Sequence, residues 1–560
     1  MRTKGRTTVQ QDLITRAKTW QAEDPDTDTR EELARLIEAA TDGTEGAADA
    51  TAELAARFSG TLQFGTAGLR GELGAGPMRM NRAVVIRAAA GLAAYLKAQG
   101  RAGGLVVVGY DARYKSADFA RDTAAVMTGA GLRAAVLPRP LPTPVLAFAI
   151  RHLGAVAGVE VTASHNPPRD NGYKVYLGDG SQIVPPADTG IAAQIDAVRS
   201  LHDVPRPESG WEILGEDVLE AYLARTDAVL TSGSPRTART VYTAMHGVGT
   251  ETLLAAFARA GFPEPVLVAE QAEPDPAFPT VAFPNPEEPG AMDLSFATAR
   301  RATPDIVIAN DPDADRCAVA VPYEGDWRML RGDELGALLA AHLVRRGVTG
   351  TFAESIVSSS LLGRIAEAAS LPYEETLTGF KWIARVEGLR YGYEEALGYC
   401  VDPDGVRDKD GITAALLVAE LASALKAEGR TLLDLLDELA VQHGLHATDQ
   451  LSVRVEDLSV IADAMRRLRE QPPTELAGLK VTSAEDLSAG TEQLPPTDGL
   501  RYHLEGARVI VRPSGTEPKI KCYLEVVLPV DSIDGVPAAR TRADRILTAI
   551  KADLSRAAGL

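Results

Sequence analysis

The most constraining feature of this sequence is an alternation of short apolar runs and helical patterns that begins at three places along the chain. In the first stretch, an Ala-rich helical pattern at 82–98 precedes the run LVVVGYD at 105–111, and a second helical pattern follows at 116–130. Strands that alternate with helices predict crossover units and mainly parallel sheets. Because the pattern resumes near residues 241 and 332, three similar α/β units are predicted.

The two ends of the chain have other patterns. Residues 9–58 are rich in Ala, Glu, Arg and Leu at helical spacing, which predicts an N-terminal helical extension. RVIVRPSGTEPKIKCYLEVV (508–527) indicates strand, loop and strand between two helical patterns, which predicts a smaller C-terminal α+β domain. The predicted fold class is therefore α/β, with three similar domains of mixed or parallel sheets plus that last domain. The expected divisions are residues 1–60, 61–236, 237–330, 331–448 and 449–560.

Charge and cysteine content exclude several classes of protein. The 560 residues include 58 basic and 77 acidic side chains, a net charge of −19, which opposes binding to a phosphate backbone. Cys317, Cys400 and Cys522 form no CxxC pattern, and Arg87 and Glu420 interrupt the longest apolar stretches. The expectation is a cytoplasmic protein with a small-molecule partner and with neither nucleic acid nor membrane as a partner. A monomer is compatible with the sequence.

The sharpest local signal is the run DPDADR. Asp311, Asp313 and Asp315 follow the apolar run DIVIAND, at the edge where open α/β sheets bind ligands. Two carboxylates about 4 Å apart repel by roughly 4 kcal/mol at an effective dielectric constant of about 20. Three converging carboxylates would need a cation, and oxygen ligands suit Mg²⁺. The alternative is a solvated acidic turn. An EF-hand is excluded because Arg316 and Pro322 stand where it needs Gly and Glu.

The segment TASHNPPRDNGYKVY (162–176) combines a loop serine with a nearby lysine. Its prolines enforce a loop around Ser164, and Lys174 follows after an expected Asp-Asn-Gly turn. Ser164 could accept and donate phosphoryl groups, with Lys174 as its positive partner. The alternatives are an exposed loop serine whose neighbours bond the backbone, and a solvated lysine at a strand edge.

The loop RPSGTEPK (512–519) concentrates groups that bind phosphate. Arg512, Ser514, Thr516 and Lys519 offer a guanidinium group, two hydroxyls and an ammonium group around a bend at Gly515. Such a bend turns successive backbone N–H groups inward, as in an anion nest. This pattern predicts a clamp for a phosphate dianion, and a hairpin with incidental charges is the alternative.

Two weaker signals add cations and carboxylates. FGTAGLRG sets Arg70 behind three glycines, so that backbone and guanidinium could both approach an anion. YEEALGY contains Glu394 and Glu395, and VRDKDG contains Arg407 and Lys409. Carboxylates suit sugar hydroxyls and cations suit phosphate, but structural charges at helix ends explain each residue equally well.

Taken in order, the serine loop, the aspartate run, the glutamate segment and the arginine loop resemble the four signature segments of the α-D-phosphohexomutase superfamily, over about residues 64–527. FGTAGLRG, TGFKWI and EEALGY are most similar to the phosphoglucomutase-2-like branch, whose members act on phosphoglucose, phosphopentose or phosphomannose. The resemblance implies four domains around a central cleft, the last of them a mobile lid. Ala396 stands where many members have Ser, which leaves one sugar contact open.

The resemblance also implies an activity and its cofactors. The enzyme would be an intramolecular phosphotransferase, most similar to phosphoglucomutase, that moves phosphate between a sugar's 1-position and its terminal position. Phosphorylated Ser164 would transfer the group through a sugar 1,6-bisphosphate, which also serves as activator. Mg²⁺ would be held by Asp311, Asp313, Asp315 and an oxygen of the phosphorylated Ser164.

The remaining roles implied by the resemblance concern proton transfer, charge and substrate binding. Arg70 and Arg316 would steady the transferring group, and Lys174 and His165 would assist proton transfer. The substrate-binding residues would be Lys381, Glu394, Glu395, Arg407, Lys409, Arg512, Ser514, Gly515, Thr516 and Lys519.

Other functions remain open at this point. Within the mutases, phosphopentomutase and phosphomannomutase are the alternatives to phosphoglucomutase. A phosphomonoester hydrolase could use the same serine and metal, and it would release inorganic phosphate instead of needing a bisphosphate. A silent sugar-phosphate-binding protein is the third hypothesis, and the intact Ser164, aspartate run and arginine loop speak against it.

Overall fold

The chain forms two compact units in a computed structural model that describes all residues except 1, 43–45, 64–67, 456 and 515–518. Unit 1 comprises residues 1–228, 240–317 and 404–412. Unit 2 comprises residues 229–239, 318–403 and 413–560.

The first sheet of unit 1 has six strands in the order β1-β5-β4-β2-β3-β6. Strands β4, β2, β3 and β6 run parallel to their neighbours, whereas β5 is antiparallel to β4 and β1 is antiparallel to β5. The strand bounds are β1 (Leu69–Glu72), β2 (Leu105–Tyr110), β3 (Arg133–Val136), β4 (Ala157–Val161), β5 (Asp170–Leu177) and β6 (Glu212–Ile213). The mixed sheet thus has a parallel centre and an antiparallel edge.

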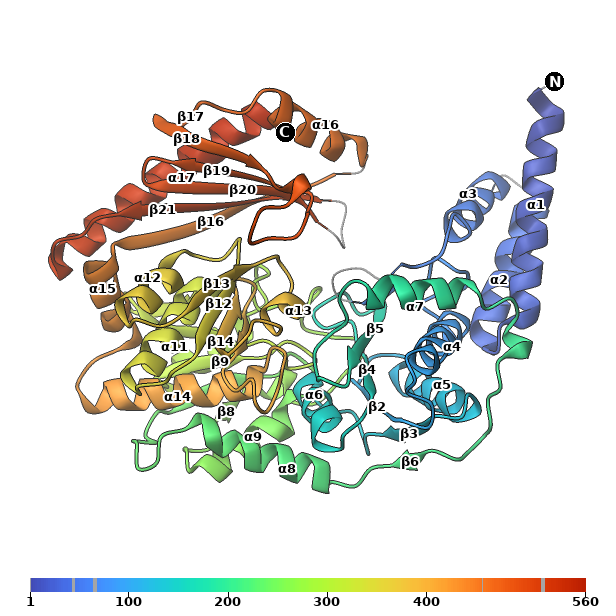
Figure 1. Cartoon of the computed structure of the whole chain (residues 1–560), viewed down its shortest axis with the longest axis horizontal. Coiled ribbons are helices and arrows are strands. Elements are labelled where there is room, and N and C mark those ends of the chain that lie inside the picture. Colours follow the sequence, from blue (N-terminus) through green and yellow to red (C-terminus); the bar gives the residue numbers. More distant parts are fainter. Residues whose placement is uncertain (1, 43–45, 64–67, 456, 515–518) are drawn as a thin grey trace. The chain divides into compact units, whose positions relative to one another are not determined.

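Helices cover both faces of this sheet, and Figure 1 shows α6 on the opposite face from α4 and α5. The apolar side chains of α4 pack on the strands, and the helix begins at Asn81, whose side chain accepts a hydrogen bond from Val84 N. Both α4 and α5 lie where the sequence predicts helices. The bounds are α4 (Arg82–Ala98), α5 (Ser116–Gly129), α6 (Thr143–His152), α7 (Ala187–Asp196) and α8 (Asp217–Thr226).

The prediction of an Asp-Asn-Gly turn at 170–172 is wrong. Asp170, Asn171 and Gly172 belong to β5, where they pair with β1. A Cβ atom at Gly172 would lie 2.4 Å from the carbonyl oxygen of Thr162, so the glycine serves close strand packing here. Asn171 donates to Ser116 Oγ at 3.0 Å, which accounts for its polar side chain.

The second sheet of unit 1 contains β7 (Thr240–Thr243), β8 (Val266–Leu267) and β9 (Ile306–Ala309), with β7 parallel to both neighbours. Helices α9 (Gly249–Ala260) and α10 (Asp293–Ala302) accompany it. Strand β7 ends before Met245 and His246, whose φ angles of 49° and 60° turn the chain. The apolar run that starts near residue 241 is therefore longer than strand β7, which ends at Thr243.

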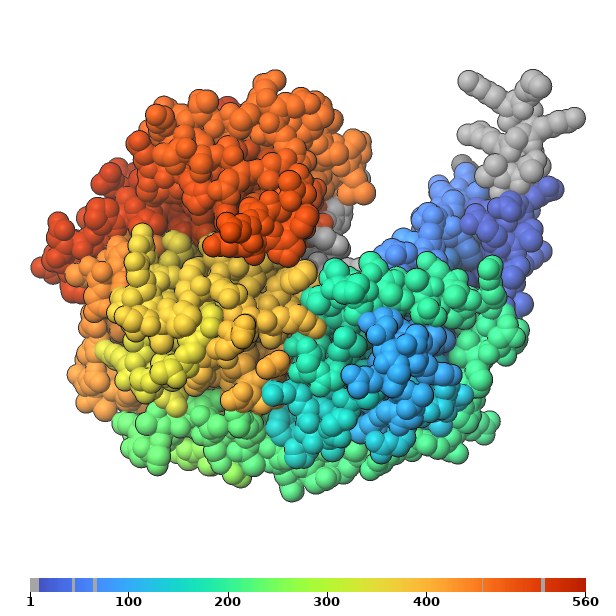
Figure 2. Space-filling model, in the orientation of Figure 1, coloured from blue at the N-terminus to red at the C-terminus, as the bar shows by residue number. Residues whose placement is uncertain are grey.

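Three helices, α1 (Arg2–Glu23), α2 (Thr27–Thr41) and α3 (Ala47–Arg57), precede the first sheet. They stand out from the rest of unit 1 in Figure 2. Leu13, Leu33, Leu54 and Phe58 form a small core with Ala75, so the helices are anchored next to β1.

Unit 2 contains a four-stranded sheet in the order β13-β12-β14-β15, parallel except for β15. A hairpin of β10 (Ala318–Tyr323) and β11 (Asp326–Met329) precedes it. The strands are β12 (Thr351–Ser355), β13 (Tyr373–Thr376), β14 (Leu389–Glu394) and β15 (Gly398–Cys400). The helices are α11 (Gly332–Arg345), α12 (Leu361–Ala368), α13 (Phe380–Ile383), α14 (Gly411–Ala427) and α15 (Leu432–His443).

The second sheet of unit 2 is antiparallel, with six strands in the order β16-β21-β20-β19-β18-β17. Helices α16 (Ser459–Glu470) and α17 (Val536–Ala558) supply apolar side chains to its core. The strands are β16 (Leu445–Arg454), β17 (Glu475–Leu476), β18 (Leu479–Asp486), β19 (Leu500–Leu504), β20 (Ala507–Pro513) and β21 (Lys519–Leu528). Three α/β domains and a C-terminal α+β domain confirm the predicted fold class. Among the described helices, none combines the length and apolar character that a membrane crossing requires.

A buried carboxylate in α14 links three elements of unit 2. Glu420 accepts hydrogen bonds from His342 in α11 and from the backbone N–H of Thr231 and the hydroxyl of Ser234 in the 229–239 segment. Burial raises its pKa, but these hydrogen bonds outweigh burial and lower the pKa from 4.5 to about 2.

Glu420→Gln is expected to make the free energy of unfolding less dependent on pH in the acidic range. Because the folded-state pKa lies below the unfolded value, the carboxylate stabilises the fold above pH 4.5 and loses this contribution as the pH falls toward 2. The contribution is on the order of 3 kcal/mol. Urea unfolding between pH 5 and pH 3 measures it, with the exposed Glu428→Gln as control. Equal pH slopes for Glu420→Gln and the parent protein would contradict the assignment.

Candidate active site

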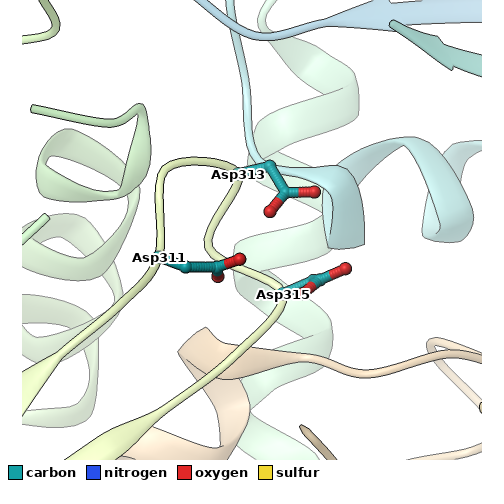
Figure 3. Close-up of side chains that lie close together, drawn as sticks. All are labelled: Asp311, Asp313 and Asp315. Carbon is teal, nitrogen blue, oxygen red and sulfur yellow. The ribbon is translucent and has the colours of Figure 1, made fainter. Parts of the chain in front are cut away.

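Three aspartates lie on the loop that follows β9. One side-chain oxygen from each of Asp311, Asp313 and Asp315 lies within 4.8 Å of the others, and all three residues are buried. Figure 3 shows their carboxyl groups around a common space. Ala314 has a φ of 55° in this loop, and Arg316 N donates to Asp311 Oδ1 at 3.1 Å, which closes the turn around the acids. The alternative of a solvated acidic turn is wrong.

A buried lysine compensates the aspartates. Lys174 Nζ lies 2.6 Å from Asp313 Oδ2 and 2.8 Å from Asp315 Oδ2, and its side chain is 3% exposed. Burial lowers the pKa of Lys174, but the two carboxylates raise it above its ordinary value. The interpretation of Lys174 as a solvated lysine is therefore wrong. Strand β5 runs to the loop of the aspartates and delivers this ammonium group.

The pKa values of Asp311 and Asp315 are shifted in opposite directions. Burial, followed by repulsion from Asp313 and Asp315, raises the pKa of Asp311 well above its ordinary value. Burial also raises the pKa of Asp315, but Lys174 and then Lys409 outweigh it, so the pKa is lowered overall. The two lysines thus favour the ionised form of Asp315, with which both form ion pairs.

Two buried oxygens of the triad, Asp313 Oδ1 and Asp315 Oδ1, have no hydrogen-bond partner among the described residues. A buried carboxylate oxygen without a partner is costly unless a cation or donor compensates it. The donor set consists only of oxygens, which hard divalent cations prefer. The residues present therefore fit a metal ion.

The loop serine faces the triad. Ser164 Oγ donates to Asp311 Oδ2 at 2.5 Å and lies 3.1 Å from His165 Nδ1. Its φ angle is 50°, and its backbone N–H donates to Thr162 Oγ1 at 2.9 Å. The residue is 2% exposed, so the alternative of an exposed loop serine is wrong. Two segments 147 residues apart in the sequence meet here.

Two arginines flank the serine and the aspartates. Arg70 Nη1 donates to Asn166 Oδ1 at 2.7 Å, and Arg316 Nε lies 3.8 Å from Asp315 Oδ1. Burial lowers the pKa of His165 well below its ordinary value, and Arg316 and Arg70 lower it further. Burial and the two arginines therefore disfavour the charged form of the His165 imidazole. The first four residues of FGTAGLRG, 64–67, lie outside the described residues.

The segment 404–412 belongs to unit 1 and adds a second lysine. Lys409 Nζ lies 3.3 Å from Asp315 Oδ2, and Asp408 accepts hydrogen bonds from Tyr176 and Gln182. Lys409 is 7% exposed, so it compensates the triad in this structure. Arg407 beside it is exposed.

The glutamate segment lies in unit 2. Glu394 ends β14, and Glu395 Oε2 accepts from Ser355 Oγ at 3.2 Å. Burial raises the pKa of Glu395, and Lys521 opposes that rise. Lys381 lies in the short helix α13, with Nζ 6.0 Å from the ring centroid of Trp382.

The arginine loop joins β20 to β21, also in unit 2. Arg512 and Ser514 are partly exposed, as is Lys519, and Ser514 N donates to Lys519 O at 2.8 Å. This bond closes the base of the loop. Gly515 and Thr516 lie outside the described residues, so the predicted clamp stays a prediction at those positions.

Sequence reasoning missed Arg113. It follows β2 in the run GYDARYK, and it is only 4% exposed. A signal was available, because a polar run directly after a parallel strand lies at the sheet edge that carries ligands. The same edge carries Ser164, which follows β4.

A buried serine that faces carboxylates, a lysine and arginines combines a hydroxyl nucleophile with the charged groups that phosphoryl transfer requires. The comparison with known families defines the class further. Four domain descriptions of one family, phosphoglucomutase/phosphomannomutase, match this chain: α/β/α domain I at 61–202, domain II at 220–325, domain III at 331–442 and the C-terminal domain at 451–542. The chain belongs to this family. It is accordingly an intramolecular phosphotransferase, as the sequence predicted.

Individual relatives cover most of the chain. A protein of Haemophilus influenzae named a probable phosphomannomutase is 51% identical over 457 residues, which is 80% of this chain and 93% of the relative. The phosphopentomutase of Mus musculus is 35% identical and covers 86% of each chain. A crystal structure of a phosphoglucomutase/phosphomannomutase family protein from Burkholderia thailandensis matches with a TM-score of 0.69 and 20% identity, over 88% of this chain and 97% of that one, which shows the shared fold.

Proposed function

We propose that this enzyme interconverts hexose 1-phosphates and hexose 6-phosphates, with glucose phosphates preferred, through phosphorylated Ser164 and a hexose 1,6-bisphosphate. The observation that carries the proposal is the Ser164 hydroxyl, 2.5 Å from Asp311 Oδ2 beside the unpartnered oxygens of the triad. The higher identity to the relative named a phosphomannomutase than to the phosphopentomutase supports a hexose over a pentose. Between the two hexoses we propose glucose, and the initial rates described below test this choice.

The proposed transfer exchanges one phosphate ester for another. The bond between phosphorus and Ser164 Oγ breaks while a bond between phosphorus and the free sugar hydroxyl oxygen forms. The hydroxyl proton passes to the serine oxygen by way of His165, whose Nδ1 lies 3.1 Å from Oγ. The bisphosphate then returns its other phosphoryl group to Ser164 by the reverse exchange. Lys174, which forms ion pairs with Asp313 and Asp315, is the second residue that we assign to this proton transfer.

Charge neutralisation is the main task of the surrounding residues in such a transfer. Arg70 and Arg316 supply fixed positive charge next to the serine, and both are positioned by neighbouring side chains. When bound by Asp311, Asp313, Asp315 and an oxygen of the phosphorylated serine, Mg²⁺ would neutralise charge on the transferred group.

Substrate binding is assigned to three further groups of residues. Glu394 and Glu395 would accept hydrogen bonds from sugar hydroxyls, and the partial burial of both supports this role. The cations along the sugar would be Lys381, Arg407 and Lys409. The group that holds the resident phosphate would be Arg512, Ser514, Gly515, Thr516 and Lys519.

Domain divisions and location are part of the same proposal. The family matches support an N-terminal extension at 1–60 followed by four domains at 61–236, 237–330, 331–448 and 449–560. The cysteines are free and buried, which supports a cytoplasmic location. The small-molecule partner is the phosphosugar itself.

Initial rates on three substrates test this function. Purified protein with Mg²⁺ and glucose 1,6-bisphosphate receives glucose 1-phosphate, mannose 1-phosphate or ribose 1-phosphate, and ³¹P NMR follows the products. Glucose 1-phosphate is expected to react fastest, and ribose 1-phosphate at least about tenfold more slowly because it lacks contacts made by a hexose.

Each other outcome identifies a different function. Faster conversion of ribose 1-phosphate would make the protein a phosphopentomutase, and faster conversion of mannose 1-phosphate a phosphomannomutase. Release of inorganic phosphate without isomerisation would make it a hydrolase. Binding of sugar phosphate with neither reaction would leave a silent binding protein, and omission of the bisphosphate is the control for priming.

A further inference from the structure

The buried side chain of Arg113 lies beneath the serine loop and binds its backbone. Nη2 donates to the carbonyl oxygens of Ser164 and Asn166, each at 2.6 Å. Nη1 donates to the carbonyl oxygens of Pro167 at 2.8 Å and Asp170 at 3.1 Å. One guanidinium group therefore gathers four carbonyl oxygens from a seven-residue stretch, 164–170.

Two further contacts fix the guanidinium group itself. Asp111 Oδ2 lies 3.4 Å from Arg113 Nε, and Asp111 Oδ1 accepts from the backbone N–H of Arg113 at 3.0 Å. On another side, the ring of Phe278 lies with its centroid 4.8 Å from Arg113 Cζ. Arg113 and Asp111 follow β2, whereas Phe278 belongs to the segment between β8 and α10. The arginine is thus contacted by side chains from two segments of unit 1, one after β2 and one after β8.

The loop needs such support because its conformation is unfavourable. Ser164 has a φ of 50°, a left-handed conformation that residues with a Cβ adopt rarely. The segment 163–168 also carries two prolines and forms no strand or helix, so regular backbone bonds do not hold it. Its carbonyl oxygens point inward to Arg113, and the Ser164 hydroxyl points to Asp311.

We propose that Arg113 is the positioning residue that holds Ser164 in its reactive conformation toward the triad. This inference rests on the proposed function of Ser164 as the phosphoryl carrier, and the guanidinium group of Arg113 donates to backbone carbonyl oxygens of the loop. A positioned nucleophile loses little entropy when the reaction begins, and a displacement of about 1 Å can cost about 100-fold in rate.

Arg113→Lys tests whether the loop needs the several N–H donors of the guanidinium group. Lysine keeps the positive charge beside Asp111, but a single ammonium nitrogen cannot reach four carbonyl oxygens in the geometry of a guanidinium group. The readouts are kcat and KM per folded molecule, the rate of Ser164 phosphorylation by glucose 1,6-bisphosphate measured by mass spectrometry, and amide hydrogen exchange across 162–171.

The expected result is a fall in kcat of about 100-fold with KM changed by less than about twofold. Phosphorylation of Ser164 is expected to slow by a similar factor, and exchange across 162–171 to rise at least about tenfold. A merely structural role would lower the folded fraction and leave these values per folded molecule unchanged.

Arg82→Lys is the matched control. Arg82 makes a two-bond fork with Asp122 at 2.7 and 2.8 Å, between α4 and α5, and it does not contact the serine loop. The Arg82→Lys substitution is expected to change neither the amide exchange across 162–171 nor the rate of Ser164 phosphorylation.

The outcomes separate this inference from the proposed function. If the parent protein lacks mutase activity, hydrogen exchange still shows whether Arg113 orders the loop. If Arg113→Lys fails to fold, Phe278→Leu takes its place, with increased exchange and a fall in kcat of about threefold or more expected. Folded Arg113→Lys with kcat within about twofold of the parent, or unchanged exchange, would overturn the proposal. A folded Phe278→Leu variant whose kcat and amide exchange across 162–171 match those of the parent would also overturn the proposal.

Discussion

Ser164→Ala is expected to lower kcat by at least about 10⁵-fold, because no other group can carry the phosphoryl ester between the two half-reactions. The loss of hydrogen bonds to Asp311 and His165 should change the free energy of unfolding by no more than about 2 kcal/mol. Turnover of glucose 1-phosphate and the intact mass after incubation with glucose 1,6-bisphosphate measure the effect. The parent protein should gain one phosphoryl group and the variant none.

Ser181→Ala is the control for this experiment. Ser181 is fully buried in the same unit, and its hydroxyl has no hydrogen-bond partner among the described residues. Removal of that hydroxyl should leave both turnover and phosphorylation unchanged. Near-parent turnover in Ser164→Ala, or a phosphoryl group found on another residue, would refute the assignment of Ser164.

Lys174→Met is expected to have the largest effect on stability. The substitution leaves the buried carboxyl groups of Asp313 and Asp315 without their ammonium partner, which should cost about 3–5 kcal/mol without a divalent cation. Mg²⁺ should restore part of the loss, because a cation bound to the folded state stabilises it by linkage. Denaturant unfolding with EDTA and with Mg²⁺ measures both values.

The comparison with the parent protein decides the interpretation. Mg²⁺ should stabilise Lys174→Met more than the parent, in which the ammonium group already compensates the triad. The fall in kcat should be at least about 100-fold even with Mg²⁺, because fixed charge next to the serine is lost. Lys97→Met, at an exposed position of α4, is the control. A variant as stable as the parent in EDTA would show that the triad does not depend on Lys174.

The sequence alone was sufficient for the fold class, for several of its helices and for most residue types of the site. Helices α4 and α5 were predictable because burial on one face leaves a helical period in the sequence. The position of the aspartates was also predictable, since polar residues directly after a parallel strand share one sheet edge. The family resemblance added roles that no single motif could carry.

Burial and partners were decided by the tertiary structure. The sequence favoured a solvated Lys174, yet the side chain lies between Asp313 and Asp315, 139 and 141 residues further along the chain. The first residues of strand β5, which carries Lys174 and lies between β1 and β4, were predicted as a turn because Asn171 and Gly172 are common in turns. In this protein, pairing with β1 outweighs the preference of Asn171 and Gly172 for turns.

The sequence by itself determined the period of the helices, the order of the α/β units and the presence of a serine, three aspartates and several cations. Only the tertiary structure decided that Ser164, Asp311, Lys174 and Lys409 meet in one buried group and that Arg113 holds the serine loop. The physical reason is that hydrophobic periodicity records which side chains are buried. The hydrogen bonds and ion pairs between distant segments depend on sheet register and loop geometry, which local sequence does not encode.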